Sequence, residues 1–333
     1  MPELDVSDCQ LRMEAPHCLP PRLTRILACP ICRANVLESP PAALRCSGCG
    51  AVYPIRDGVP RLLPREVPAV MTETAEAFGW QWHAFADQLP TFREEFLEWL
   101  APLTPGDFCG KRVLDAGCGK GRHLPLAAEF GAVQIIGLDI STAVDVARGH
   151  TSRLHNVDLV QGDLLAPPIA EGAVDLIYSI GVVHHVPDPS AAIGALAECL
   201  RPGGTLHVWV YSHEGNALVR WLVDPVRRLV ARRAPRSLVR AGTLPLAVLL
   251  EGVARLAGRF KRVTVVPYSE YLQRLGRYPT RHIWTIVYDQ LMAPTTHYVR
   301  RGDLEEWFRA AGLTHVQIRN SRGVSWTATG QRA

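Results

Sequence analysis

The stretch VLDAGCGKGRH, residues 113–123, carries three glycines at alternate positions directly after an apolar segment. Residues 112–116 read as a buried strand, and residues 122–132 read as the helix that follows the turn. Glycines at such a turn let the backbone approach a ligand closely and present N–H groups at the start of the helix. The chain therefore contains a strand, a glycine turn and a helix arranged to bind a small ligand.

Two ligand classes use loops of this kind. A dinucleotide loop spaces its glycines as G-x-G-x-x-G, whereas here the third glycine comes one residue early and Arg122 fills the expected place. Asp115 lies two residues before the first glycine, where it would repel a pyrophosphate. The same carboxylate would attract a ligand with a cationic sulfonium and an ammonium group. The loop favours S-adenosylmethionine (SAM).

Further apolar segments alternate with helical patterns downstream, at residues 133–141, 157–165, 173–189 and 191–211. Alternating strands and helices predict a parallel, doubly wound sheet that binds ligands at the carboxyl ends of its strands. Asp139 ends the second strand, about twenty residues after the glycines, where it can accept hydrogen bonds from ribose hydroxyls. Asp163 ends the third strand and is placed to meet an adenine amino group.

Residues 111–212 resemble a class I SAM-dependent methyltransferase, closest to the group that includes ubiquinone and menaquinone biosynthesis enzymes. The motifs that carry the resemblance are VLDAGCGKGRH, GLDIS, GDLL, IYSIGVVHHVPDP and LRPGGTLHV. It implies an α/β Rossmann-like fold with a seven-stranded, mostly parallel sheet and helices on both faces. The cofactor residues that it implies are Asp115, Gly117, Cys118, Gly119 and Gly121 at the methionine end, Asp139 and Ile140 at the ribose, Asp163 and Leu164 at the adenine, and Ser179 beside the transferring methyl.

His184 and His185 follow the fourth strand and are the candidate catalytic residues, because imidazole titrates near neutral pH. The alternative is that one histidine shapes the pocket and the other packs or bonds to backbone. A sulfonium is already activated for methyl transfer by its leaving group, so alignment of the acceptor can supply most of the acceleration.

Near the N-terminus, four cysteines follow the spacing C-x2-C-x13-C-x2-C. Two such pairs place four thiolates at two tight turns, which predicts a structural zinc site in a small module over residues 23–66. The segment YPIRDGVPRLLP resembles the end of zinc-ribbon modules found in front of bacterial methyltransferases and in the tRNA-methyltransferase activator family. Residues 1–22 are expected to be loosely ordered. The metal ligands are Cys29, Cys32, Cys46 and Cys49.

Three other regions surround the predicted cofactor domain. Residues 67–110 are rich in aromatics and predict a helical cap, either packed on the sheet or closing the pocket with Trp80 and Trp82. Residues 213–295 form an insertion before the C-terminal helix and last strands, 296–333. Its basic amphipathic part, 217–262, is either a lid or a surface for peripheral membrane contact. The candidates for the substrate wall are Trp80, Trp82, Tyr268, Tyr271, Asp289, His297 and Tyr298.

Composition excludes few classes of function. A net charge of +4 over 333 residues does not by itself indicate a nucleic-acid binder. The absence of an N-terminal apolar run and of 18 consecutive apolar residues leads us to expect neither a signal peptide nor a transmembrane segment, and hence a cytoplasmic protein that is free or peripheral to the membrane. The favoured function is SAM-dependent methylation of a small, lipophilic acceptor. The alternatives are a tRNA or RNA methyltransferase that grips its substrate through the zinc ribbon and the arginines, and a catalytically silent SAM-binding protein.

Overall fold

The computed structural model describes residues 19–229, 233–259 and 268–333. The expected loose N-terminus falls mostly on residues 1–18, which lie outside the described residues. The same holds for the basic residues Arg232, Lys261 and Arg262 of the insertion.

Seven strands form the central sheet in the order β7-β6-β5-β8-β9-β11-β10. The first five are parallel, whereas β11 runs antiparallel to both of its neighbours. This arrangement confirms the predicted mostly parallel, seven-stranded sheet. The strands are β5 (Arg112–Ala116), β6 (Gln134–Asp139), β7 (Val157–Gly162), β8 (Val174–Ile180), β9 (Leu200–Tyr211), β10 (Leu313–Ser321) and β11 (Ser325–Arg332).

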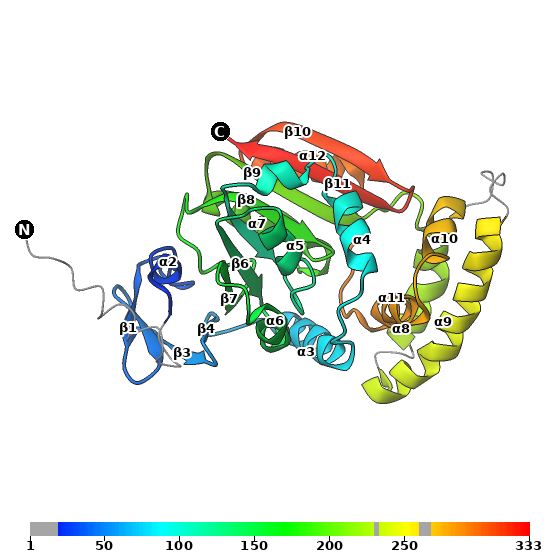
Figure 1. Ribbon diagram of the computed structural model, residues 1–333, viewed down its shortest axis with the longest axis horizontal. Helices are drawn as coiled ribbons and strands as arrows, with labels where there is room; N and C mark the ends of the chain where they lie inside the picture. The colour runs from blue at the N-terminus through cyan, green and yellow to red at the C-terminus, as the bar shows by residue number, and fades with distance from the viewer. Residues whose placement is uncertain (1–18, 230–232, 260–267) are drawn as a thin grey trace, which may run out of the picture.

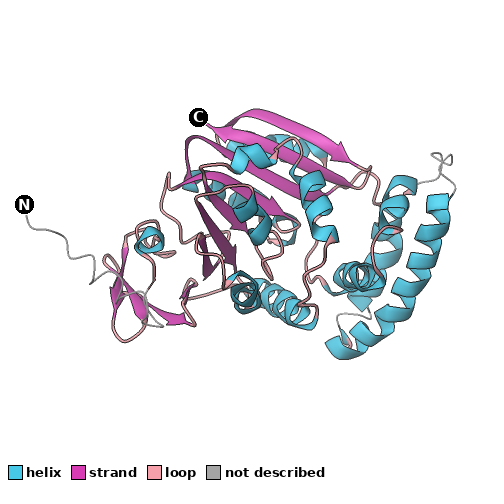
Figure 2. Cartoon of the chain, in the orientation of Figure 1, coloured by secondary structure: helices cyan, strands magenta, loops and turns pink. Residues whose placement is uncertain are grey.

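Helices cover both faces of the sheet (Figure 2). On one face α7 (Pro189–Cys199) and α12 (Arg301–Ala310) pack on the side of Leu114. On the other face α5 (Leu124–Glu129) and α6 (Ala143–Thr151) pack on the side of Val113. Successive residues of β5 thus enter different cores, as the alternation of side chains along a strand requires. Burial on both faces explains why these strands read as continuous apolar runs.

The N-terminal module extends this sheet. It contains α2 (Pro21–Thr24), β1 (Val36–Ser39), β2 (Ala43–Cys46), β3 (Val52–Arg56) and β4 (Val59–Leu62). The last of these pairs in parallel with β7, so that strand order runs through eleven strands from β1 to β10 (Figure 1). The sequence predicted seven strands and a separate module. The difference has a physical reason, because β7 would otherwise be an edge strand with unpaired backbone groups.

Side chains and backbone reinforce this junction. The Ala28 N–H donates to the carbonyl of Pro168, and the Arg33 guanidinium donates to the carbonyls of Pro167 and Ile169. Apolar residues of the module, Leu23 and Leu44 among them, belong to the same buried cluster as the sheet residue Leu114. The module and the sheet therefore share one core.

The insertion lies at the end of the molecule opposite the module, and the cap helices lie between the two (Figure 1). The cap comprises α3 (Ala69–Ala84), α4 (Thr91–Leu100) and the 3-10 turn η1 (Pro105–Phe108). The described insertion is helical, and its longest helix, α9, packs on α10 and α11. Its elements are the π-helical turn η3 (Val219–Val223), α8 (Asp224–Leu229), α9 (Arg236–Arg259), α10 (Ser269–Leu275) and α11 (Thr280–Met292).

One helix in the described part of the chain is long and apolar enough to cross a membrane, judged by length and composition alone. It spans Arg236–Ala257, with a mean hydropathy of 1.4. The sequence prediction of no transmembrane segment rested on uninterrupted apolar runs. Thr243 and Glu251 interrupt this one.

Candidate active site

A cavity of about 680 Å³ lies where the carboxyl ends of the central strands meet the cap and the insertion. This is the edge at which doubly wound sheets bind their ligands, and the volume is typical of small-molecule sites. Residues from the glycine loop, the strand ends, the cap and the helices α9, α10 and α11 all line it. Those at the sheet are Gly117, Cys118, Gly119, Asp139, Ile140, Ser141, Leu164, Ile180, Gly181 and Val182.

The glycines at positions 119 and 121 of the loop allow two different close contacts. Gly119 lines the cavity with a φ of +51°, and a Cβ there would lie 3.0 Å from Nε1 of Trp82. Gly121 does not line the cavity. Its φ is +76°, and a Cβ would come within 2.9 Å of the Cβ of Ala147 in α6. The absence of a side chain at Gly119 therefore lets the cap approach the loop, and its absence at Gly121 lets the loop pack on α6.

Asp139 occupies the predicted position at the end of β6 and lines the cavity. Its carboxylate accepts hydrogen bonds from the Gly119 N–H at 2.8 Å and from the N–H and hydroxyl of Ser141 at 2.8 and 2.6 Å. Burial raises the pKa of this carboxyl, while the same hydrogen bonds act to lower it. Asp139 thereby fixes the glycine loop against the second strand.

Other predicted cofactor residues lie behind the cavity wall. Asp115 is buried and accepts a hydrogen bond from the Tyr178 hydroxyl at 3.0 Å; burial raises its pKa to about 7. Asp163 accepts the N–H of Leu165, and the Ser179 hydroxyl donates to the carbonyl of Ala116. With Gly121, these residues do not line the cavity. They hold the strand ends in place.

The two candidate catalytic histidines are placed differently. His184 is fully buried among aromatic rings, and neither ring nitrogen has a hydrogen-bond partner within the described structure. It does not line the cavity. His185 does line the cavity, and its Nδ1 lies 2.6 Å from the carbonyl oxygen of Thr295. A carbonyl only accepts, so Nδ1 carries the proton and Nε2 keeps a lone pair. Burial lowers the pKa of His185, which keeps the ring neutral near pH 7.

Four of the seven substrate-wall candidates line the cavity, and three do not. Trp82, Tyr268, Tyr271 and Asp289 line the cavity. Trp80 packs on Tyr288, 5.6 Å between ring centroids, and the Tyr298 hydroxyl donates to Asp224. Trp80, His297 and Tyr298 do not line the cavity, and the His297 side chain is exposed.

Sequence reasoning missed a polar cluster on the cavity wall. Glu95 is 2% exposed, and its Oε2 lies 3.5 Å from Nε2 of His282 and 3.8 Å from Arg122. The Tyr278 hydroxyl donates to its Oε1 at 3.1 Å. Burial raises the pKa of Glu95 to about 7, and burial lowers the pKa of His282 to about 3.

A signal for this cluster was present. Glu95 lies between Phe92, Phe96 and Trp99 at helical spacing, so α4 carries a carboxylate on its apolar face. An acidic residue in such a position is rarely buried without a partner.

Lys120 of the glycine loop was also missed. Its ammonium is buried and donates to the carbonyls of Phe85 and Asp87 at 2.6 and 2.7 Å, at the end of the cap helix α3. Burial lowers its pKa to about 7. Lys120 therefore ties the cap to the glycine loop.

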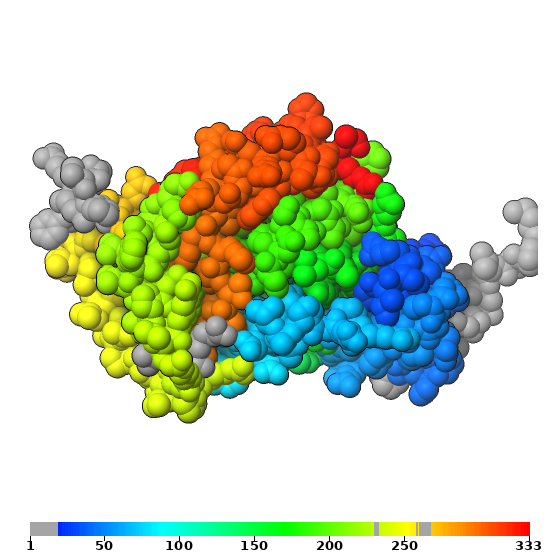
Figure 3. Space-filling view, turned by 180° about the vertical axis from the view of Figure 1, so that it is seen from behind, coloured from blue at the N-terminus to red at the C-terminus, as the bar shows by residue number. Residues whose placement is uncertain are grey.

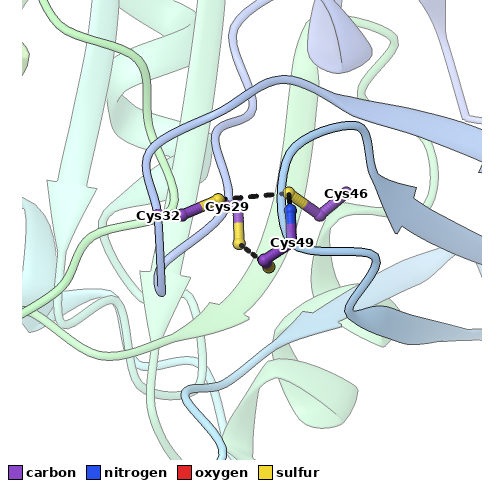
Figure 4. Close-up of side chains that lie close together, drawn as sticks. All are labelled: Cys29, Cys32, Cys46 and Cys49. Atoms are coloured by element: carbon purple, nitrogen blue, oxygen red, sulfur yellow. Dashed lines mark hydrogen bonds between the residues drawn. The ribbon is translucent and has the colours of Figure 1, made fainter.

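The four cysteines of the module converge as their spacing predicts (Figure 4). Their sulfur atoms all lie within 4.8 Å of one another, with Cys32 and Cys46 at 3.3 Å and Cys29 and Cys49 at 3.7 Å. Four sulfurs around a tetrahedral zinc ion would be about 3.8 Å apart, given the usual Zn–S distance. The N–H groups of Cys49 and Gly48 lower the pKa of Cys46 to about 6. The donor set fits a closed, structural zinc site.

Comparison with known proteins agrees with this geometry. A family profile described as a methyltransferase domain matches residues 114–208, and one described as Trm112p-like protein matches residues 21–58. A ubiquinone biosynthesis O-methyltransferase of Ralstonia nicotianae is 30% identical over 196 residues, which cover 58% of this chain and 79% of the relative. The chain belongs to the SAM-dependent methyltransferases.

This methyltransferase also resembles other proteins of known name or structure. A trans-aconitate 2-methyltransferase of Deinococcus radiodurans is 34% identical over 143 residues, covering 43% of this chain and 52% of the relative. The solved DhpI–SAH complex has the same fold, with a TM-score of 0.51 at 15% identity over 80% of this chain and 99% of that chain. The chain spans 30%, 44% and 46% of the length of the first three curated relatives it matches.

Proposed function

We propose that this protein transfers a methyl group from SAM to a lipophilic small-molecule acceptor. The observation that carries the proposal is the continuity of one cavity, which runs from the glycine loop and Asp139 to the apolar side chains of the insertion. Its second half is lined by Leu218, Val223, Leu246 and Leu250, together with Tyr271. A mostly apolar wall with a few polar groups favours an acceptor with an apolar body and a polar reacting end.

The cofactor end follows from the residues at the sheet. Gly117 and Gly119 would lie along the methionine part of SAM, Asp139 would accept the ribose hydroxyls, and Leu164 would border the adenine. Bound SAM supplies a methyl group on a sulfonium, whose leaving group is a neutral thioether. Asp139 already holds the glycine loop in shape, so little rearrangement is needed to form the site.

His185 would act on the acceptor. The carbonyl of Thr295 holds Nδ1, and the lone pair on Nε2 is free to take the proton of an acceptor hydroxyl as its oxygen gains the methyl group. The neutral state of the ring near pH 7 suits this task. The proposal therefore favours an acceptor that must lose a proton, such as a phenol or enol.

The zinc ion that we propose for the module would be structural. Four cysteine ligands leave no open position for a substrate. At the junction, Arg22 and Arg61 of the module are ion-paired with Asp158 and Asp145. Arg33 donates to two backbone carbonyls.

The second candidate function is methylation of RNA, favoured by the Trm112p-like match and by the arginines of the insertion. The engagement of Arg22, Arg33 and Arg61 at the junction weighs against it. Filter binding to total tRNA at rising salt separates the two, since contacts with phosphates weaken steeply with salt.

The direct test combines calorimetry with methyl transfer. We expect the protein to bind SAM and to move label from SAM into an organic-extractable fraction of a cell lysate, not into tRNA. His185→Gln should lower kcat by about 10²- to 10⁴-fold while leaving SAM affinity unchanged. Labelled tRNA would favour the second candidate, and SAM binding without any labelled product would indicate a silent binding protein.

A further inference from the structure

The outward side of the insertion exposes an unusual number of large apolar side chains. Of the 17 exposed large hydrophobic residues in the described chain, 12 lie between residues 218 and 256. Scattered apolar residues are normal on a surface, whereas a contiguous patch marks a binding surface. We call these residues the apolar face: Leu218, Trp221, Leu222, Val226, Leu229, Leu238, Leu244, Leu246, Val248, Leu249, Val253 and Leu256.

Helix α9 provides most of this face, since seven of its twelve residues lie in α9. Its inner stripe, Thr243, Ala247, Glu251 and Ala254, is buried against α10 and α11. Its outer side carries Leu249, which is 66% exposed. The helix lies on the outer flank of the molecule (Figures 1 and 3). An apolar outer side is unexpected for a helix that faces water.

The exposed charged side chains around the apolar face are positive. Between residues 217 and 262 the sequence has two acidic residues, Asp224 and Glu251. Both are buried and ion-paired, the first with Arg227 and the second with Arg255. Exposed arginines flank the apolar side chains instead, at positions 228, 233, 255 and 259. An apolar surface with a basic fringe complements an anionic lipid headgroup layer.

The apolar face continues into the cavity. Leu218 and Leu246 are both about half exposed, at 51% and 50%, and both line the cavity. Val219, Val223 and Leu250, their neighbours in η3 and α9, line it as well. The helices that would meet a bilayer therefore also form the wall of the acceptor end.

We propose that the apolar face docks on the surface of an anionic bilayer, with α9 lying in the plane of the interface, and that the cavity takes its acceptor from the lipid phase. The first part stands on exposure and charge alone. The second part rests on the function proposed above. A helix in the plane keeps its inner stripe packed on α10 and α11, which a spanning orientation would expose to lipid.

Vesicle flotation with the full-length protein tests the docking. We expect flotation with phosphatidylcholine vesicles containing a quarter phosphatidylglycerol, and at least about tenfold weaker binding to pure phosphatidylcholine. The double variant Leu249→Asp/Val253→Asp should reduce binding to the anionic vesicles by at least about tenfold. The matched control Leu37→Asp/Val133→Asp changes one exposed leucine and one exposed valine elsewhere on the surface, and should bind like the unchanged protein.

Circular dichroism and calorimetry with SAM accompany each variant. Both double variants should keep their fold and their SAM affinity, so a loss of flotation reports the surface itself. Equal losses in the two double variants, absence of flotation, or a concentration-dependent dimer of the unchanged protein that buries the face would overturn the docking proposal. Resistance to extraction at alkaline pH would replace it with a spanning helix. Absence of methyl transfer with intact vesicle binding would instead count against the proposed function.

Discussion

The two regions that flank the SAM-binding sheet are attached to it by different means. The N-terminal module adds β4 to the edge of the sheet and shares its apolar core. The insertion meets the cap through side chains, notably the buried cluster of Glu95, Tyr278 and His282. Main-chain pairing and a shared core resist separation, whereas a buried polar cluster is stable only while each group keeps its partner and protonation state.

The module also supports the cofactor end of the cavity. Arg61 donates to the side chain of Gln161, which in turn donates to the carbonyl of Ile140 in the cavity wall. The insertion forms the acceptor end. The comparison predicts that damage to the module spreads into the sheet, while damage to the insertion stays local and depends on pH.

The largest effect is expected from Cys46→Ser. Loss of one of four ligands should release zinc and lower the free energy of unfolding by several kcal/mol, on the order of 5, because binding of a structural metal is coupled to folding. Thermal unfolding measures the loss, and hydrogen exchange should show reduced protection of the Ala170 N–H, which donates to the carbonyl of Ile26 across the junction. Cys109→Ser, at an exposed cysteine outside the cluster, is the control. A protein that loses the ion without any change outside residues 19–66 would refute the shared core.

Next in size is the pH dependence conferred by Glu95. Its pKa is raised from 4.5 to about 7, so the folded state holds a proton that the unfolded state releases. The resulting stability is fully present below pH 4.5 and is lost as the pH rises through 7, up to about 3 kcal/mol. Glu95→Gln should flatten the fall of the unfolding free energy between pH 5 and pH 8, measured by urea titration. If the variant and the unchanged protein fall in parallel, the insertion is not held by this carboxyl.

Asp139→Ala and Asp289→Asn test the cofactor end and the acceptor end of the cavity separately. Loss of the charged hydrogen bonds of Asp139 should weaken SAM binding by about 1 to 3 kcal/mol, measured by calorimetry. Asp289→Asn, at the acceptor end, should leave SAM affinity unchanged and raise the KM of the acceptor. An unchanged dissociation constant for Asp139→Ala would contradict the assignment of this strand end to the ribose.

The smallest changes in unfolding free energy are expected from two ion pairs, one in each region. Arg22 donates to the buried Asp158, and Arg281 of the insertion donates to Asp87, which is 54% exposed. Arg22→Gln should cost about 1 to 2 kcal/mol, because it leaves a buried carboxylate short of partners. Asp87→Asn should cost less than about 1 kcal/mol, as exposed pairs do. Equal losses in chemical denaturation would remove the distinction between the two attachments.

The sequence predicted the sheet and the metal cluster correctly because their signals are local. The strands β5 to β8 are mostly apolar and each ends at or beside a glycine or an aspartate, and the four cysteines are spaced for two tight turns. The union of the module with the sheet was missed, since pairing of Arg61 with Gln161 joins segments a hundred residues apart. For the same reason, the sequence did not show that three of the seven substrate-wall candidates do not line the cavity.

The glycine loop, the succession of strands and helices along the chain, the carboxylate at the end of β6 and the cysteine set can all be read from the sequence, because periodicity and spacing act within one element. Three features depend on the folded chain. His185 lines the cavity and His184 does not, Glu95 meets His282 from a distant helix, and the outer apolar side of α9 is exposed. A pattern records how polar and apolar residues alternate along a segment. Which side of that segment meets a partner depends on elements far away in the chain.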